Sequence, residues 1–471
     1  MKFDKNKPIY MIGIKGVGMT MLAQFLHGAG YKVIGSDGPE TFMTDKVLRR
    51  IGIKFFNGFS VANLKQAGSL IIHSSAYNVN NNVEMAEAKR LKKKILSYAE
   101  ALGVAFNSYD GIAVCGSHGK TTTSAWLGYV MWKSGLDPNV LVGARVPQFR
   151  GSALNGAGKY FVAETDEYQN KLQFYNPKMV LLNNIDYDHP DFFHTKNDYN
   201  QVFADFIKKL PAKGFLIANA ADKNILKILP NCHGKIITYD IVPNKKANYY
   251  AFNIEQSGVN QIFNVFANGE DLGKFKIILS GNHNIANALA VIAAARSLGI
   301  DLPLIKRNLA TFRSTERRMQ TLGKFNGALI IDDYAHHPTE VKATLNGIKR
   351  LYPDKNIITV FHPHTFTRTK ALLNDFAKSF SDTDELIVLD IYGSAREKQG
   401  GVSSADLLVK IKEFNKSQIK PGMTRKKQIV KHIPIMPAVE DYLRDKLGAD
   451  DLLVLMGAGD VFRVAQRLLK K

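Results

Sequence analysis

Short apolar runs alternate with helical patterns through the first part of the chain. Residues 9–14, 32–36, 53–56 and 70–74 are short runs rich in β-branched residues, which is typical of buried parallel strands. Between the first two runs, residues 19–30 place apolar side chains at helical spacing and end in glycine, a common C-terminal signal of helices. The order strand, glycine turn, helix, strand predicts the beginning of a doubly wound sheet.

The same layout begins again near residue 106. An apolar run at 111–116 leads into a helical pattern at 121–134, and strand-like runs follow at 160–163, 179–183 and 214–219. Residues 284–298 are apolar on nearly every side, which predicts a helix buried in an interior.

A third unit follows residues 312–318. It has strand-like runs at 329–332, 357–361, 385–389 and 452–455, with helical patterns at 338–350 and 369–380. We therefore predict an α/β protein of three domains. The expected limits are 1–105 for a Rossmann-like domain, 106–315 for a central P-loop ATPase-type α/β domain, and 316–471 for a second Rossmann-like domain.

Composition changes this picture only through charge. The 471 residues are 45% hydrophobic and 22% charged, which is ordinary for a soluble globular protein and excludes disorder or collagen. However, 63 Lys and Arg against 42 Asp and Glu give a net charge of +21. That surplus favours an anionic partner, or it reflects lysines that are simply solvated. The basic runs at 89–94 and 425–431 read as polar helix or turn and lack the interleaved aromatics that base stacking needs.

Nothing in the sequence predicts a membrane span or a secreted protein. Cys115 and Cys232 are too few for a disulfide framework. No apolar run reaches the ~18 residues that a span requires, and Lys15 interrupts the first apolar stretch before it could serve as a signal peptide. We expect a cytoplasmic enzyme.

The first glycine turn contains Gly13, Gly16 and Gly18, with Lys15 where the GxGxxG fingerprint has its middle glycine. Glycines let backbone amides approach a phosphate at a helix N-terminus. Asp37, about 20 residues on, is placed to hold a nucleoside hydroxyl. The turn predicts a nucleotide-phosphate site, and the alternative is a tight turn that needs glycine for its own geometry.

The second glycine turn is the sharper motif. Gly116, Ser117, His118, Gly119, Lys120, Thr121 and Thr122 follow an apolar strand and open a helix. Backbone amides of such a loop cradle phosphates, the lysine reaches the β and γ groups, and the threonine hydroxyl binds Mg²⁺. The first glycine is only three positions before Gly119, so the strict P-loop pattern is not met. A purely structural loop is the alternative.

Carboxylates and a histidine follow two later strands. Glu164 and His189 each come just past an apolar run, and ligands bind at the carboxyl ends of strands in such sheets. We expect Glu164 to face the Mg²⁺ at Thr121 and His189 to face a second ion. A histidine in this position can also be purely structural.

Together these features resemble the Mur ligases, ATP-dependent amide-forming enzymes of peptidoglycan synthesis, over essentially the whole chain. The matching segments are IGIKGVGM (12–19), GSD (35–37), HSSA (73–76), GSHGKTTT (116–123), VAETDE (162–167), NNIDYDH (183–189), GNHNIANALA (281–290), RRM (317–319), DDYAHHPTE (332–340), FHPHTFTRT (361–369), LDIYGSARE (389–397), GVSS (401–404) and MGAGD (456–460).

The resemblance implies that the N-terminal domain holds a UDP-sugar, the central domain binds ATP, and the C-terminal domain closes over both with an amino acid. UDP-sugar contacts are then expected at Gly16, Val17, Gly18, Ser36, Asp37, Ser74, Ser75 and Ala76. ATP contacts are expected at Gly116, Ser117, His118, Gly119, Lys120, Thr121, Thr122, Asn184, His283, Asn287, Arg318, Asp333 and His336. The amino acid would meet His364 and Arg368, Mg²⁺ would be held by Thr121, Glu164 and His189, and the catalytic residues would be Lys120, Glu164, His189 and Arg318.

The implied chemistry is physically consistent. A carboxylate must be activated before it forms an amide, and the ATP γ-phosphoryl group does so by making an acyl phosphate, with Lys120 and Mg²⁺ offsetting the charge. The amine then attacks through a tetrahedral intermediate. Arg368 offers a planar two-donor fork for an α-carboxylate, unless it is a surface arginine at a helix start. His336 and His337 are adjacent, so at most one should face the nucleotide.

Two interpretations remain within the family, and they differ in the acceptor. The resemblance is closest to members that join L-alanine to the lactyl carboxylate of UDP-N-acetylmuramate, and 361–369 and 390–397 favour that reading. Lys15, residues 182–193 and Met319 favour members that recycle a murein tripeptide onto the same UDP-sugar. The third domain selects the amine, so we expect L-alanine, in a monomer or homodimer. A basic NTP-dependent nucleic-acid-binding protein is the alternative of another class, but no nucleic-acid reading module is recognisable.

Overall fold

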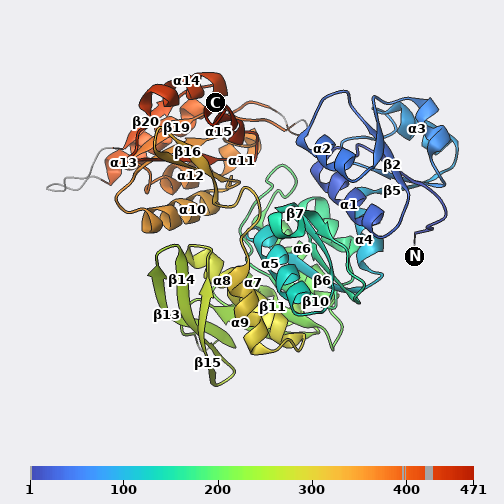
Figure 1. Ribbon diagram of the computed structural model, residues 1–471, viewed down its shortest axis with the longest axis horizontal. Coiled ribbons are helices and arrows are strands. Elements are labelled where there is room, and N and C mark those ends of the chain that lie inside the picture. The colour runs from blue at the N-terminus through green and yellow to red at the C-terminus, as the bar shows by residue number, and fades with distance from the viewer. Residues whose placement is uncertain (1–2, 245, 395–396, 398, 419–427, 471) are drawn as a thin grey trace.

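The chain forms three separate sheets. Their central strands are apolar, because a strand covered by helices on both faces buries nearly every side chain. The computed structural model describes residues 3–244, 246–394, 397, 399–418 and 428–470. The sheets follow one another along the chain, from the blue N-terminal unit through the green and yellow central unit to the red C-terminal unit (Figure 1). The predicted α/β fold with three sheets is confirmed.

The N-terminal sheet is parallel, in the order β3-β2-β1-β4-β5. Its strands are β1 (Ile9–Ile12), β2 (Val33–Asp37), β3 (Lys54–Asn57), β4 (Leu70–His73) and β5 (Lys94–Ser97). Its helices are α1 (Val17–Gly28), α2 (Met43–Arg50), η1 (Val61–Gln66), α3 (Val83–Arg90) and α4 (Tyr98–Phe106). The helix expected over 19–30 begins earlier, at Val17, directly after the glycine turn, and ends at Gly28.

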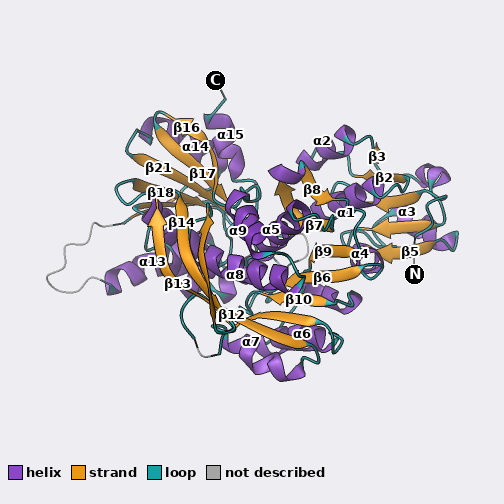
Figure 2. Cartoon of the chain, turned by 60° about the horizontal axis from the view of Figure 1, so that its bottom comes forward, coloured by secondary structure: helices purple, strands orange, loops and turns teal. Residues whose placement is uncertain are grey.

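The central sheet is mixed, in the order β15-β14-β13-β12-β11-β10-β6-β9-β7-β8. Its strands are β6 (Asp110–Cys115), β7 (Asn139–Val146), β8 (Gly151–Leu154), β9 (Tyr160–Glu164), β10 (Met179–Leu182), β11 (Phe215–Asn219), β12 (Lys235–Asp240), β13 (Tyr249–Ser257), β14 (Asn260–Ala267) and β15 (Glu270–Ile277). Its helices are α5 (Lys120–Lys133), η2 (Pro147–Phe149), η3 (Tyr168–Phe174), α6 (Lys196–Lys208), α7 (Lys223–Ile228), η4 (Leu229–Asn231), α8 (Asn282–Ser297) and α9 (Leu302–Thr311). The antiparallel edge β13–β15 extends the parallel part, and the buried helices α5 and α8 pack together (Figure 2).

The C-terminal sheet has the order β16-β17-β21-β18-β19-β20 and is parallel except for the β16–β17 pair. Its strands are β16 (Gln320–Phe325), β17 (Ala328–Asp333), β18 (Asn356–Phe361), β19 (Glu385–Val388), β20 (Ile429–His432) and β21 (Asp451–Met456). Its helices are α10 (Pro338–Leu351), α11 (Phe366–Ala371), α12 (Leu373–Ser379), α13 (Ser404–Ser417), α14 (Met436–Lys446) and α15 (Phe462–Leu468).

Two local expectations were wrong. The single helix expected over 369–380 is two helices, because the helical conformation is interrupted at Leu372 between α11 and α12. The basic run at 425–431 does not stay in a polar helix or turn, because Lys431 lies in β20, paired with Ile387 of β19. Arg425, Lys426 and Lys427 of that run, like Ala395 and Arg396 of the LDIYGSARE segment, lie outside the described residues.

Apolar packing joins the units unequally. One core contains side chains of both the N-terminal and central units, and the ring of Phe25 on α1 lies 4.9 Å from that of Phe161 on β9. In the C-terminal unit, the two large apolar cores of the described residues contain buried side chains of that unit alone. The N-terminal unit is therefore anchored to the central unit by apolar contact, and the C-terminal unit meets it through polar groups.

The described helices include none that is both long and apolar enough to cross a membrane.

A buried carboxylate ties together the N-terminal unit. Glu84 on α3 is fully buried and accepts hydrogen bonds from the Tyr10 hydroxyl, the Ser36 hydroxyl, the Ser60 amide and the Asn63 side chain. Its partners come from β1, β2 and the segment around η1, so one side chain fixes three elements.

We expect Glu84→Ala to destabilise the N-terminal unit by about 3 kcal/mol, because several buried donors lose their acceptor at once. Differential scanning calorimetry should show a lower unfolding temperature. Glu87→Ala, on the same helix, removes a carboxylate whose one side-chain partner among the described residues is the exposed Arg90. It should change the unfolding temperature little; equal effects of the two substitutions would contradict the argument.

Candidate active site

The glycine-rich loop between β6 and α5 needs glycine for steric reasons of its own. Gly116 has φ 121° and Gly119 has φ 78°, in the left-handed region that favours glycine. A Cβ atom at Gly119 would lie 2.7 Å from the Asn287 side-chain oxygen, and one at Gly116 would lie 2.7 Å from the Asn184 carbonyl. The loop is thus pressed against α8 and the segment after β10, and its Ser117 and His118 amides donate to the carbonyl and side-chain oxygens of Asn184.

Lys120 begins α5 with its ammonium turned back over this loop. Its Nζ donates to the carbonyls of Gly116 and Ser117 and lies 3.0 Å from Glu167 Oε2. Burial lowers the pKa of Lys120, but the charges of Glu167 and Asp166 outweigh it and raise that pKa above its ordinary value. The ammonium therefore remains a cation at every physiological pH.

Two clusters of possible metal ligands flank the start of α5. In the first, the Thr121 hydroxyl donates to Glu164 Oε1 over 2.9 Å. In the second, ligand atoms of Asp166, Glu167 and His189 lie within 4.8 Å of one another. Hard oxygen ligands of this kind suit Mg²⁺. The structure pairs Thr121 with Glu164 as expected, and gives His189 three carboxylate neighbours, Asp166, Glu167 and Asp188, that sequence reasoning missed.

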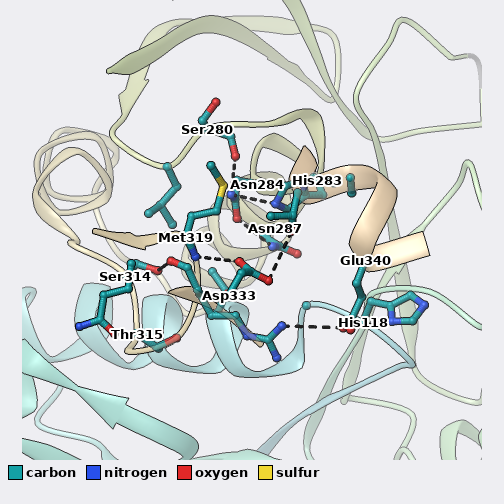
Figure 3. A pocket seen from close by; sticks show the side chains of 18 of the residues that line it. His118, Ser280, His283, Asn284, Asn287, Ser314, Thr315, Met319, Asp333 and Glu340 are labelled. Carbon is teal, nitrogen blue, oxygen red and sulfur yellow. Dashed lines mark hydrogen bonds and ion pairs between the residues drawn. The ribbon is translucent and has the colours of Figure 1, made fainter. Parts of the chain in front are cut away.

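A cavity of about 590 Å³ lies between the central and C-terminal units (Figure 3). Its lining includes eight of the expected nucleotide residues: His118, Gly119, Thr122, Asn184, His283, Asn287, Arg318 and Asp333. Gly116, Ser117, Lys120, Thr121 and His336 are not among the described residues that line it. The residues that line the cavity come from both the central and the C-terminal unit.

Two titratable groups in the wall of this cavity have strongly shifted pKa values. Burial, helped by the charge of Arg318, lowers the pKa of His283 to about 4, so its ring is neutral. Burial also raises the pKa of Asp333 to about 6, against the opposing charge of Arg318. Asp333 accepts the backbone amides of Met319 and Ala335, and so shapes the segment that carries Arg318.

Three further polar atoms in the cavity wall were missed from the sequence. The hydroxyls of Ser280 and Thr315 and the side-chain oxygen of Asn183 are buried and have no hydrogen-bond partner among the described residues. Buried polar groups are normally paired. These atoms thus offer contacts to a polar ligand, but no motif marks Ser280 or Thr315 in the sequence.

A second cavity, of about 340 Å³, lies between the N-terminal and central units. Five of the expected UDP-sugar residues line it: Gly16, Val17, Gly18, Ser74 and Ser75. Glu164, Asp166 and Lys171 line the opposite wall, and Tyr98 lines it from α4. Glu164 therefore connects this cavity with the glycine-rich loop through its bond to Thr121.

Ser36, Asp37 and Ala76 are not among the described residues that line the second cavity. Ser36 is fully buried and donates to Glu84. Asp37 accepts hydrogen bonds from the backbone amides of Lys15 and Gly38 and from the Tyr77 hydroxyl. Both side chains are occupied inside the N-terminal unit.

Lys15, the irregular position of the first glycine turn, is buried as well. Its ammonium donates to the carbonyls of Gly38 and Glu40 and lies 3.6 Å from Asp45. It ties the glycine turn to the segment that follows β2.

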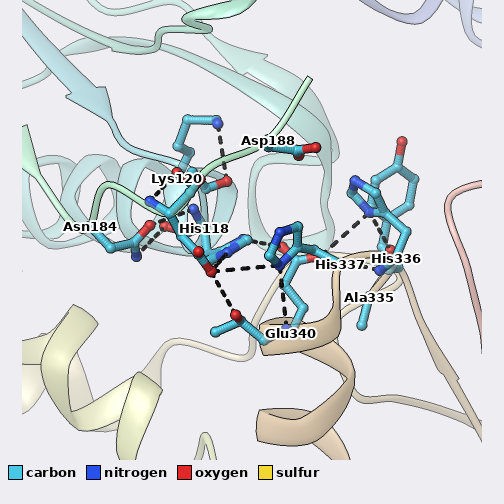
Figure 4. A network of polar contacts seen from close by, with 12 residues as sticks. His118, Lys120, Asn184, Asp188, Ala335, His336, His337 and Glu340 are labelled. Atoms are coloured by element: carbon cyan, nitrogen blue, oxygen red, sulfur yellow. Dashed lines mark hydrogen bonds and ion pairs between the residues drawn. The ribbon is translucent and has the colours of Figure 1, made fainter. Parts of the chain in front are cut away.

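Polar side chains hold the central and C-terminal units together around His118 (Figure 4). Its Nε2 lies 3.0 Å from Asp186 Oδ2, and its Nδ1 lies 3.3 Å from Glu340 Oε1 of α10. Burial lowers the pKa of His118, but the hydrogen bonds with the two carboxylates outweigh it and raise that pKa from 6.5 to about 9. His118 is therefore a cation that bridges two units.

Glu340 connects His118 to the rest of the interface. Its carboxylate lies 3.8 Å from Arg318 Nη1 and 3.4 Å from His336 Nδ1. On the same helix, the Thr339 hydroxyl donates to Asp186. One end of α10 thus touches the glycine-rich loop, the segment after β10 and the arginine of the larger cavity.

The adjacent histidines point in different directions, as expected. His337 caps α10 by accepting the Thr339 amide, and its Nε2 lies 3.3 Å from the Tyr187 carbonyl. The ring of His336 lies 6.2 Å from that of His364. Neither histidine is among the described residues lining the larger cavity, so His336 lies on the side of His364 and Arg368.

Arg368 is a buried residue of α11, which contradicts the alternative that it lies on the surface. Its Nε and Nη2 donate to the two carboxylate oxygens of Asp188, over 2.7 and 3.2 Å, and its Nη1 donates to the His364 carbonyl. Asp188 belongs to the central unit, so this fork also crosses between units.

Comparison with known proteins gives a consistent result along the chain. The model of the Mur ligase family, catalytic domain, matches residues 8–110, that of the Mur ligase middle domain matches 114–295, and that of the Mur ligase, glutamate ligase domain, matches 317–459. The chain belongs to the Mur ligase family. The resemblance inferred from the motifs is confirmed.

Relatives match this Mur ligase over its full length. A UDP-N-acetylmuramate--L-alanine ligase of Desulfitobacterium hafniense is 38% identical over 98% of this chain and 99% of its own, and one of Acetivibrio thermocellus is 38% identical over 99% and 96%. Among solved structures, a UDP-N-acetylmuramate-alanine ligase of Thermotoga maritima matches with TM-score 0.80 and 24% identity, covering 98% of both chains. A murein peptide ligase of Psychrobacter arcticus matches with TM-score 0.73 and 25% identity, also covering 98% of both.

The acidic site residues missed from the sequence lie inside motifs already recognised. Asp166 and Glu167 belong to the VAETDE segment, Asp186 and Asp188 to NNIDYDH, and Glu340 to DDYAHHPTE. Their position past strands β9, β10 and β17 marks them as near the site. Which of them meet across the units depends on how the units pack.

We expect Lys120→Ala to lower the turnover number of this Mur ligase by about 10³-fold, because a preorganised cation beside the phosphates would be lost. ADP release would be measured in a coupled assay, with circular dichroism to check the fold. Lys133→Ala, at the exposed other end of α5, should keep full activity. Normal ADP release by folded Lys120→Ala would refute the role of this loop.

We expect high pH to open the contact between the central and C-terminal units. The pKa of His118 is raised to about 9 from 6.5, so its stabilisation is complete below pH 6.5 and disappears as the pH rises through 9. Small-angle scattering should show an increasing radius of gyration between about pH 8 and pH 10. His118→Gln should abolish this step, and an unchanged curve in that variant would contradict the assignment.

Proposed function

We propose that this Mur ligase joins L-alanine to the lactyl carboxylate of UDP-N-acetylmuramate, with ATP converted to ADP and phosphate, in peptidoglycan precursor synthesis. Support comes from relatives named UDP-N-acetylmuramate--L-alanine ligase, which are 34 to 38% identical over nearly the whole chain.

One structural observation carries the proposal. The glycine-rich loop stands between two cavities: His118, Gly119 and Thr122 line the larger one, and Glu164, bonded to Thr121, lines the smaller one. A nucleotide in the larger cavity and a carboxylate substrate in the smaller one would meet at this loop. That arrangement suits transfer of a phosphoryl group from one to the other.

The three reactants divide among three domains in this proposal. Residues 1–105 take the UDP-sugar, with the diphosphate at Gly16 to Gly18 and further contacts at Ser74 and Ser75, which line the same cavity. Residues 106–315 take ATP, with phosphates at the glycine-rich loop and adenine near His283 and Asn287, which line the larger cavity. Residues 316–471 take the amino acid, at His364 and Arg368.

The chain's own cations prepare the reaction. Lys120 is permanently charged and lies over the loop, where it would offset the negative charge of the γ-phosphoryl group during transfer to the carboxylate. Arg318, which lines the larger cavity, would hold the nucleotide from the C-terminal side. The acyl phosphate then meets the alanine amine, and the tetrahedral intermediate breaks down with loss of phosphate.

The donor sets near α5 fit Mg²⁺. We propose that Thr121 and Glu164 hold one ion, and that His189 with Asp166 and Glu167 holds a second, since their ligand atoms lie together. When bound, Mg²⁺ would neutralise phosphate charge and polarise the transferring group. A cytoplasmic location is part of the same proposal, since ATP and UDP-sugars are cytoplasmic substrates.

Closure of the C-terminal domain would protect the acyl phosphate from water. The His118–Glu340 and Arg368–Asp188 contacts join that domain to the central one. They lie close to the residues that would hold the reactants, so closing the domains would complete the site.

The acceptor assay decides the function. With ATP, Mg²⁺ and UDP-N-acetylmuramate, we expect L-alanine to stimulate ADP release at least about 10-fold more strongly, in kcat/KM, than the murein tripeptide, because the free amino acid leaves no peptide arm to be accommodated. Preference for the tripeptide would establish the recycling activity instead. Salt-sensitive binding to DNA, without acceptor-dependent ADP release, would refute both.

A further inference from the structure

The segment after β10 presents two carboxylates to the C-terminal unit. Asp186 accepts from the Thr339 hydroxyl on α10 over 2.6 Å, and Asp188 accepts the guanidinium fork of Arg368 on α11. Between them, the Tyr187 carbonyl meets His337. Three consecutive residues of the central unit therefore contact three points on the other unit.

The two carboxylates have different surroundings. Asp186 contacts His118 and Thr339, and 39% of its side chain is exposed. Asp188 is buried, with 7% of its side chain exposed, and Arg368 is buried to a similar degree at 5%. Removing one partner of a buried pair leaves the other charge unpaired, which is strongly unfavourable.

The Asp188 fork fixes the direction of Arg368. Two guanidinium nitrogens donate to Asp188, and the third donates to the His364 carbonyl at the start of the same segment. The side chain is held from one side by the central unit and from the other by its own. His336 approaches the same place, since its ring lies 6.2 Å from that of His364.

We propose that Asp188 is a positioning residue for the amino-acid site: it holds Arg368, from the opposite domain, in the orientation that receives the α-carboxylate of the acceptor. The acceptor site is then complete only when the central and C-terminal domains are closed. This inference rests on the proposed function, because it assigns Arg368 to the amino acid.

A competing arrangement makes the opposite prediction. If Asp188 merely occupied the place of the α-carboxylate, removing its charge would free Arg368 and tighten acceptor binding. If Asp188 positions Arg368, the same change releases the fork and weakens acceptor binding. The direction of the change in KM for L-alanine therefore separates the two.

The central experiment is steady-state kinetics of Asp188→Asn. We expect the KM for L-alanine to rise at least about 10-fold, because the fork loses its charged partner. The KM values for ATP and UDP-N-acetylmuramate should stay within about two-fold, because neither Asp188 nor Arg368 is among the described residues that line the two cavities assigned to those substrates. Asp191→Asn, an exposed aspartate of the same segment that accepts only from the Tyr168 hydroxyl among the described residues, is the matched control and should leave all three KM values unchanged.

A double variant tests whether Asp188 acts through Arg368. In an Arg368→Lys background, Asp188→Asn should raise the KM for L-alanine by less than about two-fold more, since residues that act as a unit are not additive. Asp188→Glu keeps the carboxylate, so the logarithm of its KM for L-alanine should rise by at most half as much as that of Asp188→Asn. This variant also tests the proposal if Asp188→Asn folds poorly. Independent, additive effects of the two substitutions would overturn the proposal.

The neighbouring His189 requires a separate readout. In single-turnover experiments without L-alanine, Asp188→Asn should form ADP from ATP and UDP-N-acetylmuramate at the wild-type rate. The reason is that the Asp188–Arg368 contact is needed for binding of the amino acid and not for activation of the carboxylate. A slowed first step would show that Asp188 acts on the metal-binding residues and would overturn the proposal, as would an unchanged or lowered KM for L-alanine. A wild-type enzyme that L-alanine does not stimulate would instead refute the proposed function.

Discussion

The parallel pairing of β6 with β9 on one side and β10 on the other is the constraint on which the site depends. In this register Val114 pairs with Glu164 and Cys115 with Leu182, so the three strands end at one edge of the sheet. The glycine-rich loop, the acidic segment after β9 and the segment after β10 must therefore meet. Lys120, Glu167 and His189 come together from three distant parts of the chain because their strands end side by side.

Different forces join the outer units to the central one. The N-terminal unit shares an apolar core with it, and such a contact is costly to open because it exposes apolar surface. The C-terminal unit is joined through His118, Asp186, Asp188 and their charged partners. Charged groups can exchange their partners for water, so this second interface is suited to open for substrates and to close for reaction.

The surplus of positive charge has only a limited connection with this site. Lys120 and Arg318 would bind phosphates, and Arg368 would bind a carboxylate. Lys15, in contrast, donates to carbonyls of the N-terminal unit and stabilises a turn there. Asp37, which has the sequence position of a ribose-binding residue, accepts hydrogen bonds from Lys15, Gly38 and Tyr77 of the same unit.

The sequence by itself determined the three α/β units, the two glycine turns and the family, because strand periodicity, glycine positions and ordered motifs are local properties of the chain. It also placed Thr121 beside Glu164, since both follow neighbouring strands. Only the tertiary structure decided that Ser36 is turned inward, that Glu340 reaches His118, and that Arg368 grips Asp188. The first of these contacts depends on how the N-terminal unit folds, and the other two depend on how separate units pack. No spacing along the chain determines which charged side chain of one unit will face which of another.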